Sequence, residues 1–151
     1  MTTQAHEEFG GDAEVGELVR GFESGELPPA EFGHRGHLTV ALWYALRHGA
    51  ADAARVMREA LGAYLDRHGL GPEVYHETLT IFWMRRVCAF CGAAGGDGVA
   101  PASRPLYALA NELAREFVDS RLVYAYYSEA LIKSDAARRE WVAPDLRPLD
   151  F

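Results

Sequence analysis

Apolar residues recur every three or four positions along most of this chain, which is the spacing of amphipathic helices. No stretch alternates strictly between apolar and polar residues, as a half-buried strand would. Five segments carry the helical pattern, and glycine or proline separates most of them: residues 13–23, 34–48, 50–68, 73–92 and 106–118. The sequence therefore predicts an all-α fold, a single helical bundle of about five main helices.

The fourth segment differs from the others in its distribution of apolar residues. Between Leu79 and Cys91 it is apolar nearly all round, whereas the other segments keep a polar face. A helix without a polar face is normally surrounded by other helices. We therefore expect residues 73–92 to form the centre of the bundle.

Three parts of the chain lie outside the five long segments: the N-terminus, the connection after the fourth segment, and the region after the fifth. Residues 1–12 are polar and predict a flexible N-terminus, which leaves 13–151 as one helical domain. Residues 92–101, rich in glycine and alanine, predict a mobile connection. Short helical pieces are expected at 124–127, after Ser128 and after Ser134, because serine is a good N-cap residue.

The last eight residues are predicted to be an extended tail, because prolines stand at positions 144 and 148. Three apolar side chains could hold this tail on the bundle: Leu146, Leu149 and Phe151.

Composition places the chain among soluble globular proteins. It has 151 residues, of which 49% are hydrophobic and 25% charged, and no apolar run approaches the length of a membrane span. The formal charge of −7 disfavours nucleic acid as a partner, because proteins that bind phosphates concentrate Lys and Arg. The acidic first residues do not resemble a signal peptide, so we expect a cytoplasmic protein that uses neither nucleic acid nor membrane.

The two cysteines, Cys88 and Cys91, lie three residues apart in the apolar fourth segment. A disulfide between them would strain a helix. We expect both thiols to be reduced and buried.

The first candidate motif for chemistry is G-H-R-G-H-L, residues 33–38. Residues three apart share one face of a helix, so His34 and His37 can direct their imidazoles into one volume. Two nitrogen ligands within one turn suit a transition metal. The alternative is structural: His34 caps the helix or pairs with an acid, and His37 packs in the core.

The second motif is Y-H-E-T-L-T, residues 75–80, at the start of the fourth segment. Thr80 stands where the zinc-protease motif H-E-x-x-H has its second histidine, which excludes that reading. A histidine and a carboxylate beside an apolar helix need partners if they are buried. Alternatively, His76 and Glu77 simply occupy the first turn, where the helix dipole favours a carboxylate.

Together the two motifs could converge on a metal site. His34, His37, His76 and Glu77 would supply three nitrogen ligands and one oxygen ligand for a divalent transition metal such as zinc, iron or copper. His76 and Glu77 would also be the catalytic residues, with Glu77 either a ligand or a general base that acts through metal-bound water.

Other residues could contribute to a substrate or cofactor pocket. Tyr126 and Tyr127, with Tyr124, form an aromatic cluster that offers phenol oxygens, and Arg138 could bind a carboxylate. Core packing for the tyrosines and a solvated helix face for Arg138 are the alternatives.

Several of these pieces resemble a family of small bacterial helical proteins that has no established activity. The family motifs are F-x-H-x-x-H-L and Y-H-E-T-[LI]-T. The matching positions, in order, are Phe22-Glu23, Leu27-Pro28, Phe32-x-His34-x-x-His37-Leu38, residues 75–80 with Trp83, Tyr126-Tyr127-Ser128, Ser134, Ala137-Arg138 and Pro144-Asp145-Leu146. The resemblance implies that both histidine motifs are family features of one shared site.

Two functions are consistent with these observations. The first is a metal-dependent small-molecule enzyme, a hydrolase or an oxidoreductase, that uses the His/His/His/Glu set. The second is a non-catalytic module that binds a small molecule or a partner protein and whose histidines are structural. Substrate, metal and oligomeric state stay open.

Overall fold

The computed structural model describes residues 8–94 and 104–151, and within these residues it contains helices and no strand. The predicted all-α bundle with five long helices is confirmed. These helices are α1 (Asp12–Ser24), α2 (His34–His48), α3 (Ala50–Arg67), α4 (Glu77–Ala94) and α5 (Leu106–Glu116). The shorter pieces are η2 (Pro29–Glu31), η3 (Pro72–Val74), η5 (Ser120–Ala125), α6 (Glu129–Ile132) and α7 (Asp135–Arg139).

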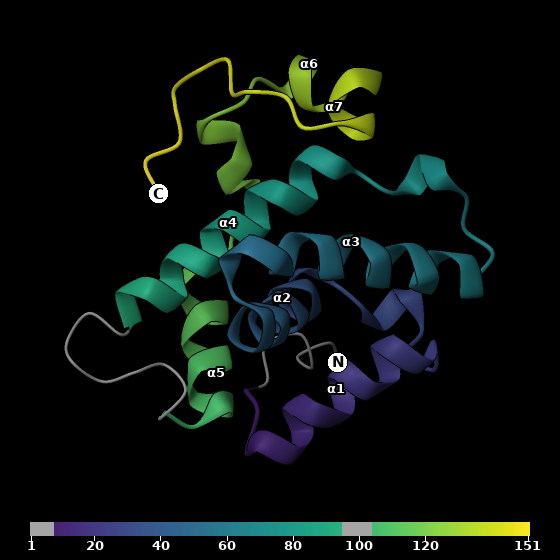
Figure 1. The fold of residues 1–151 in the computed structure, drawn as a ribbon, viewed down its shortest axis with the longest axis vertical. Helices are drawn as coiled ribbons and strands as arrows, with labels where there is room; N and C mark the ends of the chain where they lie inside the picture. The colour runs from purple at the N-terminus through teal and green to yellow at the C-terminus, as the bar shows by residue number, and fades with distance from the viewer. Residues whose placement is uncertain (1–7, 95–103) are drawn as a thin grey trace.

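Helix α2, and not α4, is the centre of the bundle. Figure 1 shows α2 nearly end-on in the middle, and it packs against α1, α3, α4 and α5. Its buried residues run almost without interruption from Leu38 to Ala45. The expectation that residues 73–92 lie at the centre is therefore wrong.

Helix α4 is apolar on two faces because it lies between two hydrophobic clusters. Met84, Val87 and Phe90 belong to the main core, which α1, α2, α3 and α5 share. Phe82 belongs to a second cluster, built with Val123, Tyr126, Tyr127 and Ile132. The helix also starts four residues later than predicted, since Pro72–Val74 forms a separate turn.

The C-terminal segments pack on the outer face of α4, as Figure 1 shows in yellow and light green. Ser128 and Ser134 cap α6 and α7 as predicted: their hydroxyl oxygens accept the backbone N–H of Leu131 and Ala137. The tail after position 144 is extended. Its anchor is Phe151, packed with Leu149 against the second cluster.

Two expectations for the chain ends need correction. Leu146 does not anchor the tail, because 57% of it is exposed. The predicted flexible segment 1–12 falls partly outside the described residues, but from Phe9 onward it is held. Phe9 is buried, and its backbone N–H and carbonyl bond the Asn111 side chain at 2.8 and 3.0 Å.

The predicted connection 92–101 lies mostly outside the described residues, apart from the end of α4. Over the part of the chain that is described, no helix is long and apolar enough to cross a membrane.

Candidate functional site

His34 opens helix α2 and links it to the far end of α5. Its Nε2 donates a hydrogen bond of 2.8 Å to the carbonyl of Phe117, and its ring lies edge-on to Trp83 at 4.7 Å between centroids. A carbonyl can only accept, so Nε2 carries the hydrogen. A neutral His34 therefore keeps its lone pair at Nδ1.

His37, one turn later, is fixed by the residues that precede it in the motif. Its ring stacks on Phe32 at 4.0 Å, and its Nδ1 donates to the carbonyl of Gly33 at 2.8 Å. Gly36 makes this stacking possible, since a Cβ there would lie 2.8 Å from the Phe32 ring. The second glycine of the motif is thus a packing requirement.

Part of His37 is exposed to solvent, yet desolvation by the surrounding protein lowers its pKa. The bond to the Gly33 carbonyl raises the pKa, and the neighbouring His34 lowers it. The net lowering favours a neutral ring. Because Nδ1 carries the hydrogen, the free lone pair of His37 is at Nε2.

His76 is the N-cap of helix α4 and uses both ring nitrogens. Its Nδ1 accepts the backbone N–H of Leu79 at 3.2 Å, and its Nε2 donates to the carbonyl of Ile132 at 2.7 Å. One neutral tautomer satisfies both bonds. A metal could bind His76 only by displacing one of these partners.

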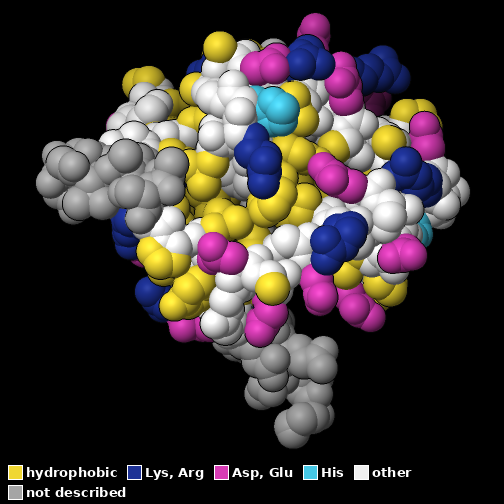
Figure 2. All heavy atoms as spheres, turned by 60° about the horizontal axis from the view of Figure 1, so that its bottom comes forward, with side chains coloured by type: hydrophobic (Ala, Val, Ile, Leu, Met, Phe, Trp, Pro, Cys, Tyr) yellow, Lys and Arg dark blue, Asp and Glu magenta, His cyan; other side chains and the backbone are white. Residues whose placement is uncertain are grey.

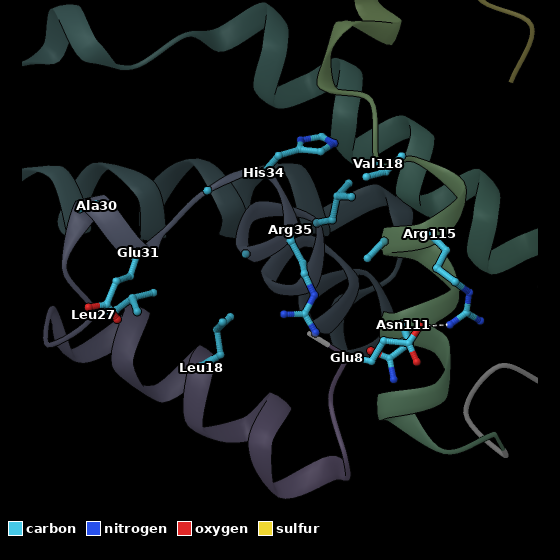
Figure 3. Close-up of a pocket in the computed structure, with 14 residues that line it drawn as sticks. Glu8, Leu18, Leu27, Ala30, Glu31, His34, Arg35, Asn111, Arg115 and Val118 are labelled. Carbon is cyan, nitrogen blue, oxygen red and sulfur yellow. Dashed lines mark hydrogen bonds and ion pairs between the residues drawn. The ribbon is translucent and has the colours of Figure 1, made fainter. Parts of the chain in front are cut away.

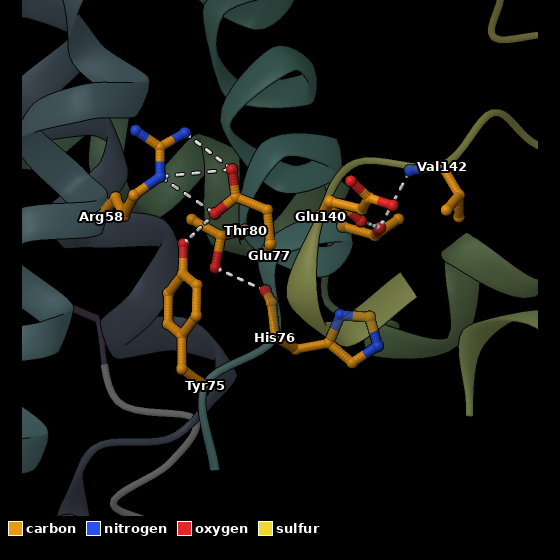
Figure 4. A network of polar contacts seen from close by, with 8 residues as sticks. Arg58, Tyr75, His76, Glu77, Thr80, Glu140 and Val142 are labelled. Atoms are coloured by element: carbon orange, nitrogen blue, oxygen red, sulfur yellow. Dashed lines mark hydrogen bonds and ion pairs between the residues drawn. The ribbon is translucent and has the colours of Figure 1, made fainter. Parts of the chain in front are cut away.

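Glu77 points away from His76, as Figure 4 shows. Arg58 binds its carboxylate with three contacts of 2.7 to 3.2 Å, and the Tyr75 hydroxyl donates to it at 2.6 Å. The Arg58 bond is the main reason that the pKa of Glu77 is lowered, with Tyr75 adding to it against the opposing effect of burial. A carboxylate with a lowered pKa is a weak general base at neutral pH.

The three motif histidines line one cavity of about 580 Å³ between α2, α3, α4 and η5, which we call the histidine cavity. Its walls are mostly apolar: Leu38, Ala41, Met57, Leu61, Leu65, Val74, Leu79, Trp83, Met84 and Val123. Its polar side chains are the three histidines, Tyr75, Thr80, Ser120, Arg121 and Tyr124. Glu77 does not line it.

Three residues predicted to bind a cofactor lie elsewhere. Tyr126 and Tyr127 are buried in the second cluster, where their hydroxyls donate to Asp150 at 2.7 Å and to the Val142 carbonyl at 2.6 Å. Arg138 pairs with Asp135 at 2.8 Å. None of the three lines the histidine cavity, so the structure favours core packing and helix-surface pairing for them.

The predicted ligand set does not form a cluster in this structure. Among residues 8–94 and 104–151, no group of three or more His, Cys, Asp or Glu side chains is placed to hold a metal ion. The reason is local, because neighbouring residues at a helix start project in different directions. The ion pair with Arg58 holds the Glu77 carboxylate away from the histidines. The metal stays a prediction.

A second cavity, also of about 580 Å³, lies between α1, α2 and α5. We call it the arginine cavity, because Figure 3 shows Arg35 extending into it and Arg115 at its edge. His34 belongs to the lining of both cavities. Figure 2, which brings the lower end of Figure 1 forward, shows hydrophobic side chains around a hollow with basic and acidic ones beside it.

The sequence indicated no role for several residues within or near these motifs. Arg58 and Tyr75 hold Glu77, and Arg121 lines the histidine cavity from η5. One signal was available for the first pair, since a carboxylate beside an apolar helix requires a partner. Nothing in the sequence selects Arg58 among the arginines that could serve.

The cysteines agree with expectation in one respect only. Both are free thiols, but each is partly buried and not fully so. Desolvation raises the pKa of Cys88, and that of Cys91 to about 11. Raised thiol pKa values make both poor nucleophiles.

Comparison with protein-family models, with curated proteins and with solved structures gave no match for this chain. The resemblance of its motifs to a bacterial family therefore stays a prediction.

Proposed function

We propose that this protein binds a small organic molecule in the histidine cavity. The observation that carries the proposal is the cavity itself, whose apolar walls surround three histidines brought together from two helix starts. Its volume of about 580 Å³ lies within the usual range of ligand pockets. Ligand pockets usually have mostly apolar walls with a few polar groups, as this cavity does.

The histidines have unequal roles in this proposal. His76 is structural, since its two nitrogens hold the start of α4 and the Ile132 carbonyl. His34 and His37 each bond one backbone carbonyl and keep one ring nitrogen for a ligand. This arrangement supports a binding module, in which histidines shape the cavity and two of them contact its occupant.

A neutral fluorescent probe, 1-aminoanthracene, tests the proposal. We expect it to bind with saturable enhancement of fluorescence. Two matched variants locate it: Val74 and Val118 are 53% and 64% exposed, and each lines a different cavity. Val74→Trp narrows the histidine cavity and should weaken binding about tenfold, whereas Val118→Trp should leave it unchanged.

The opposite result, with binding lost only in Val118→Trp, would assign the ligand to the arginine cavity. Failure of 1-aminoanthracene to bind the parent protein at all would contradict the proposal.

Metal-dependent catalysis remains the second hypothesis from the sequence. It requires His76 and Glu77 to leave their present partners, and Glu77 has three contacts with Arg58 to lose. Elemental analysis of protein purified without a polyhistidine tag decides the matter. Near-stoichiometric zinc, iron or copper that His76→Ala abolishes would favour the metal enzyme over the binding module.

A further inference from the structure

We propose that the ligand of the histidine cavity is an organic acid, an apolar body with one carboxylate-like group that Arg121 binds. This inference rests on the proposed function and adds the charge and orientation of the ligand.

The first observation is the charge of the lining. The chain has 22 acidic and 15 basic residues, yet among residues 8–94 and 104–151 no Asp or Glu lines the histidine cavity. The arginine cavity, of the same volume, includes Glu8 and Glu31 in its lining. An acid-free cavity in an acidic protein repels an anion less than the rest of the surface does, and would give a cation no counter-charge.

Glu77 is the acidic residue nearest in sequence to the α4 residues that line the cavity, but its carboxylate is held away from the cavity. Glu77 follows His76 directly, but Arg58 and the Tyr75 hydroxyl hold its carboxylate outside the lining. Figure 4 shows this network on the side of α4 that faces Arg58. Its negative charge is therefore compensated by Arg58 before it can oppose an acidic ligand.

Arg121 is the charged group that remains in the lining. It is exposed, lies over the Tyr124 ring at 5.2 Å, and forms no ion pair with any described residue. Its influence on Glu129 is secondary, because Lys133 pairs with that carboxylate at 2.6 Å and is the main cause of its lowered pKa. A guanidinium without an ion pair at the mouth of an apolar cavity suits a carboxylate.

The remaining polar groups fit the same ligand. Ser120 adjoins Arg121 in η5 and carries a hydroxyl that can donate to an acid group. The rest of the lining includes apolar side chains of α2, α3 and α4, which suit an aliphatic or aromatic body. The acid group would then lie at η5 and the body would extend toward Trp83.

Three probes of one shape but different charge test the inference by isothermal titration calorimetry: 4-phenylbutyrate, 4-phenylbutanamide and 4-phenylbutylamine. We expect the acid to bind about fivefold more tightly than the amide, the scale of a solvent-exposed ion pair, and the amine to bind most weakly. Arg121→Gln should remove the preference of the acid over the amide and leave the affinity for the amide unchanged. Arg115→Gln, in the arginine cavity, is the control and should preserve the preference.

The outcomes separate the two proposals. If no probe binds and 1-aminoanthracene also fails, the proposed function is wrong. If the amide or the amine binds as tightly as the acid, the cavity is a binding site but the ligand is not an acid. A preference for the acid that persists in Arg121→Gln would overturn the assignment to Arg121.

Discussion

Replacing His76 distinguishes a structural histidine from a metal ligand. In the structure its ring has two tasks: Nδ1 caps α4 through the Leu79 N–H, and Nε2–H bonds the Ile132 carbonyl of α6. His76→Ala removes both bonds. His76→Asn keeps a good N-cap residue but is too short to reach Ile132.

The magnitudes follow from the two bonds. Loss of an N-cap costs about 1 kcal/mol. Loss of a hydrogen bond to a partly buried carbonyl costs about 1 to 2 kcal/mol, because the acceptor is left without its donor. We therefore expect His76→Ala to lower the free energy of unfolding by about 2 to 3 kcal/mol and His76→Asn by about 1 to 2 kcal/mol.

Urea unfolding followed by circular dichroism, with and without EDTA, measures these differences. His48→Ala is the control, since His48 is exposed at the end of α2 and should change the stability by less than about 0.5 kcal/mol. Equal destabilisation by Ala and Asn would refute the capping role. Parent stability that falls to that of His76→Ala only when EDTA is present would refute the structural reading as a whole.

Three further predictions concern other parts of the molecule. Glu77→Gln should cost about 1 kcal/mol at pH 7 through loss of its ion pair with Arg58. The pKa of Glu77 in the folded protein is lowered from its ordinary 4.5, so this contribution to stability is present above pH 4.5 and is lost as the pH falls through the folded pKa. The urea midpoints of parent and variant should therefore converge in acid. A difference that stays constant with pH would contradict the prediction. With a pKa of about 11, Cys91 should react with iodoacetamide at pH 8 at least about tenfold more slowly than free cysteine, and an equal rate measured by mass spectrometry would show that its thiol is not desolvated. Asn111→Ala removes both bonds to the Phe9 backbone and should cost about 1 to 3 kcal/mol in urea unfolding, with faster proteolysis near the N-terminus; unchanged cleavage would mean that Phe9 is held by its ring alone.

Most helix bounds could be predicted because local residues determine them. Helix α2 begins and ends where the sequence indicates, between Gly33 and Gly49, and the serine caps of α6 and α7 are local bonds within four residues. The centre of the bundle was not predictable in the same way. Because α4 is apolar nearly all round, the sequence predicts that other elements cover it on several sides. It does not indicate that the C-terminal turns and tail are among those elements.

The tyrosines illustrate why the candidate site was only partly predicted. Tyr124, Tyr126 and Tyr127 lie within four residues, yet only Tyr124 lines the histidine cavity. In the 3-10 turn of η5 and just beyond it, successive side chains point in different directions, so tyrosines that are close in sequence lie in different environments. Which of them faces the cavity depends on how this turn docks on α4, and that docking has no local signal.

The three motif histidines line one cavity, but the sequence leaves their roles open, for one physical reason. His34 bonds the carbonyl of Phe117, 83 residues away, and His76 bonds that of Ile132, 56 residues away. Each histidine thus links a helix start to the C-terminal third of the chain through a backbone acceptor. Every residue has a carbonyl, so such a partner leaves no trace in the sequence, whereas a metal or a carboxylate partner would require particular residue types. A pair of histidine motifs therefore indicates that the histidines lie close together more securely than it indicates that they bind the same ligand. Here the histidines lie together in the wall of one cavity.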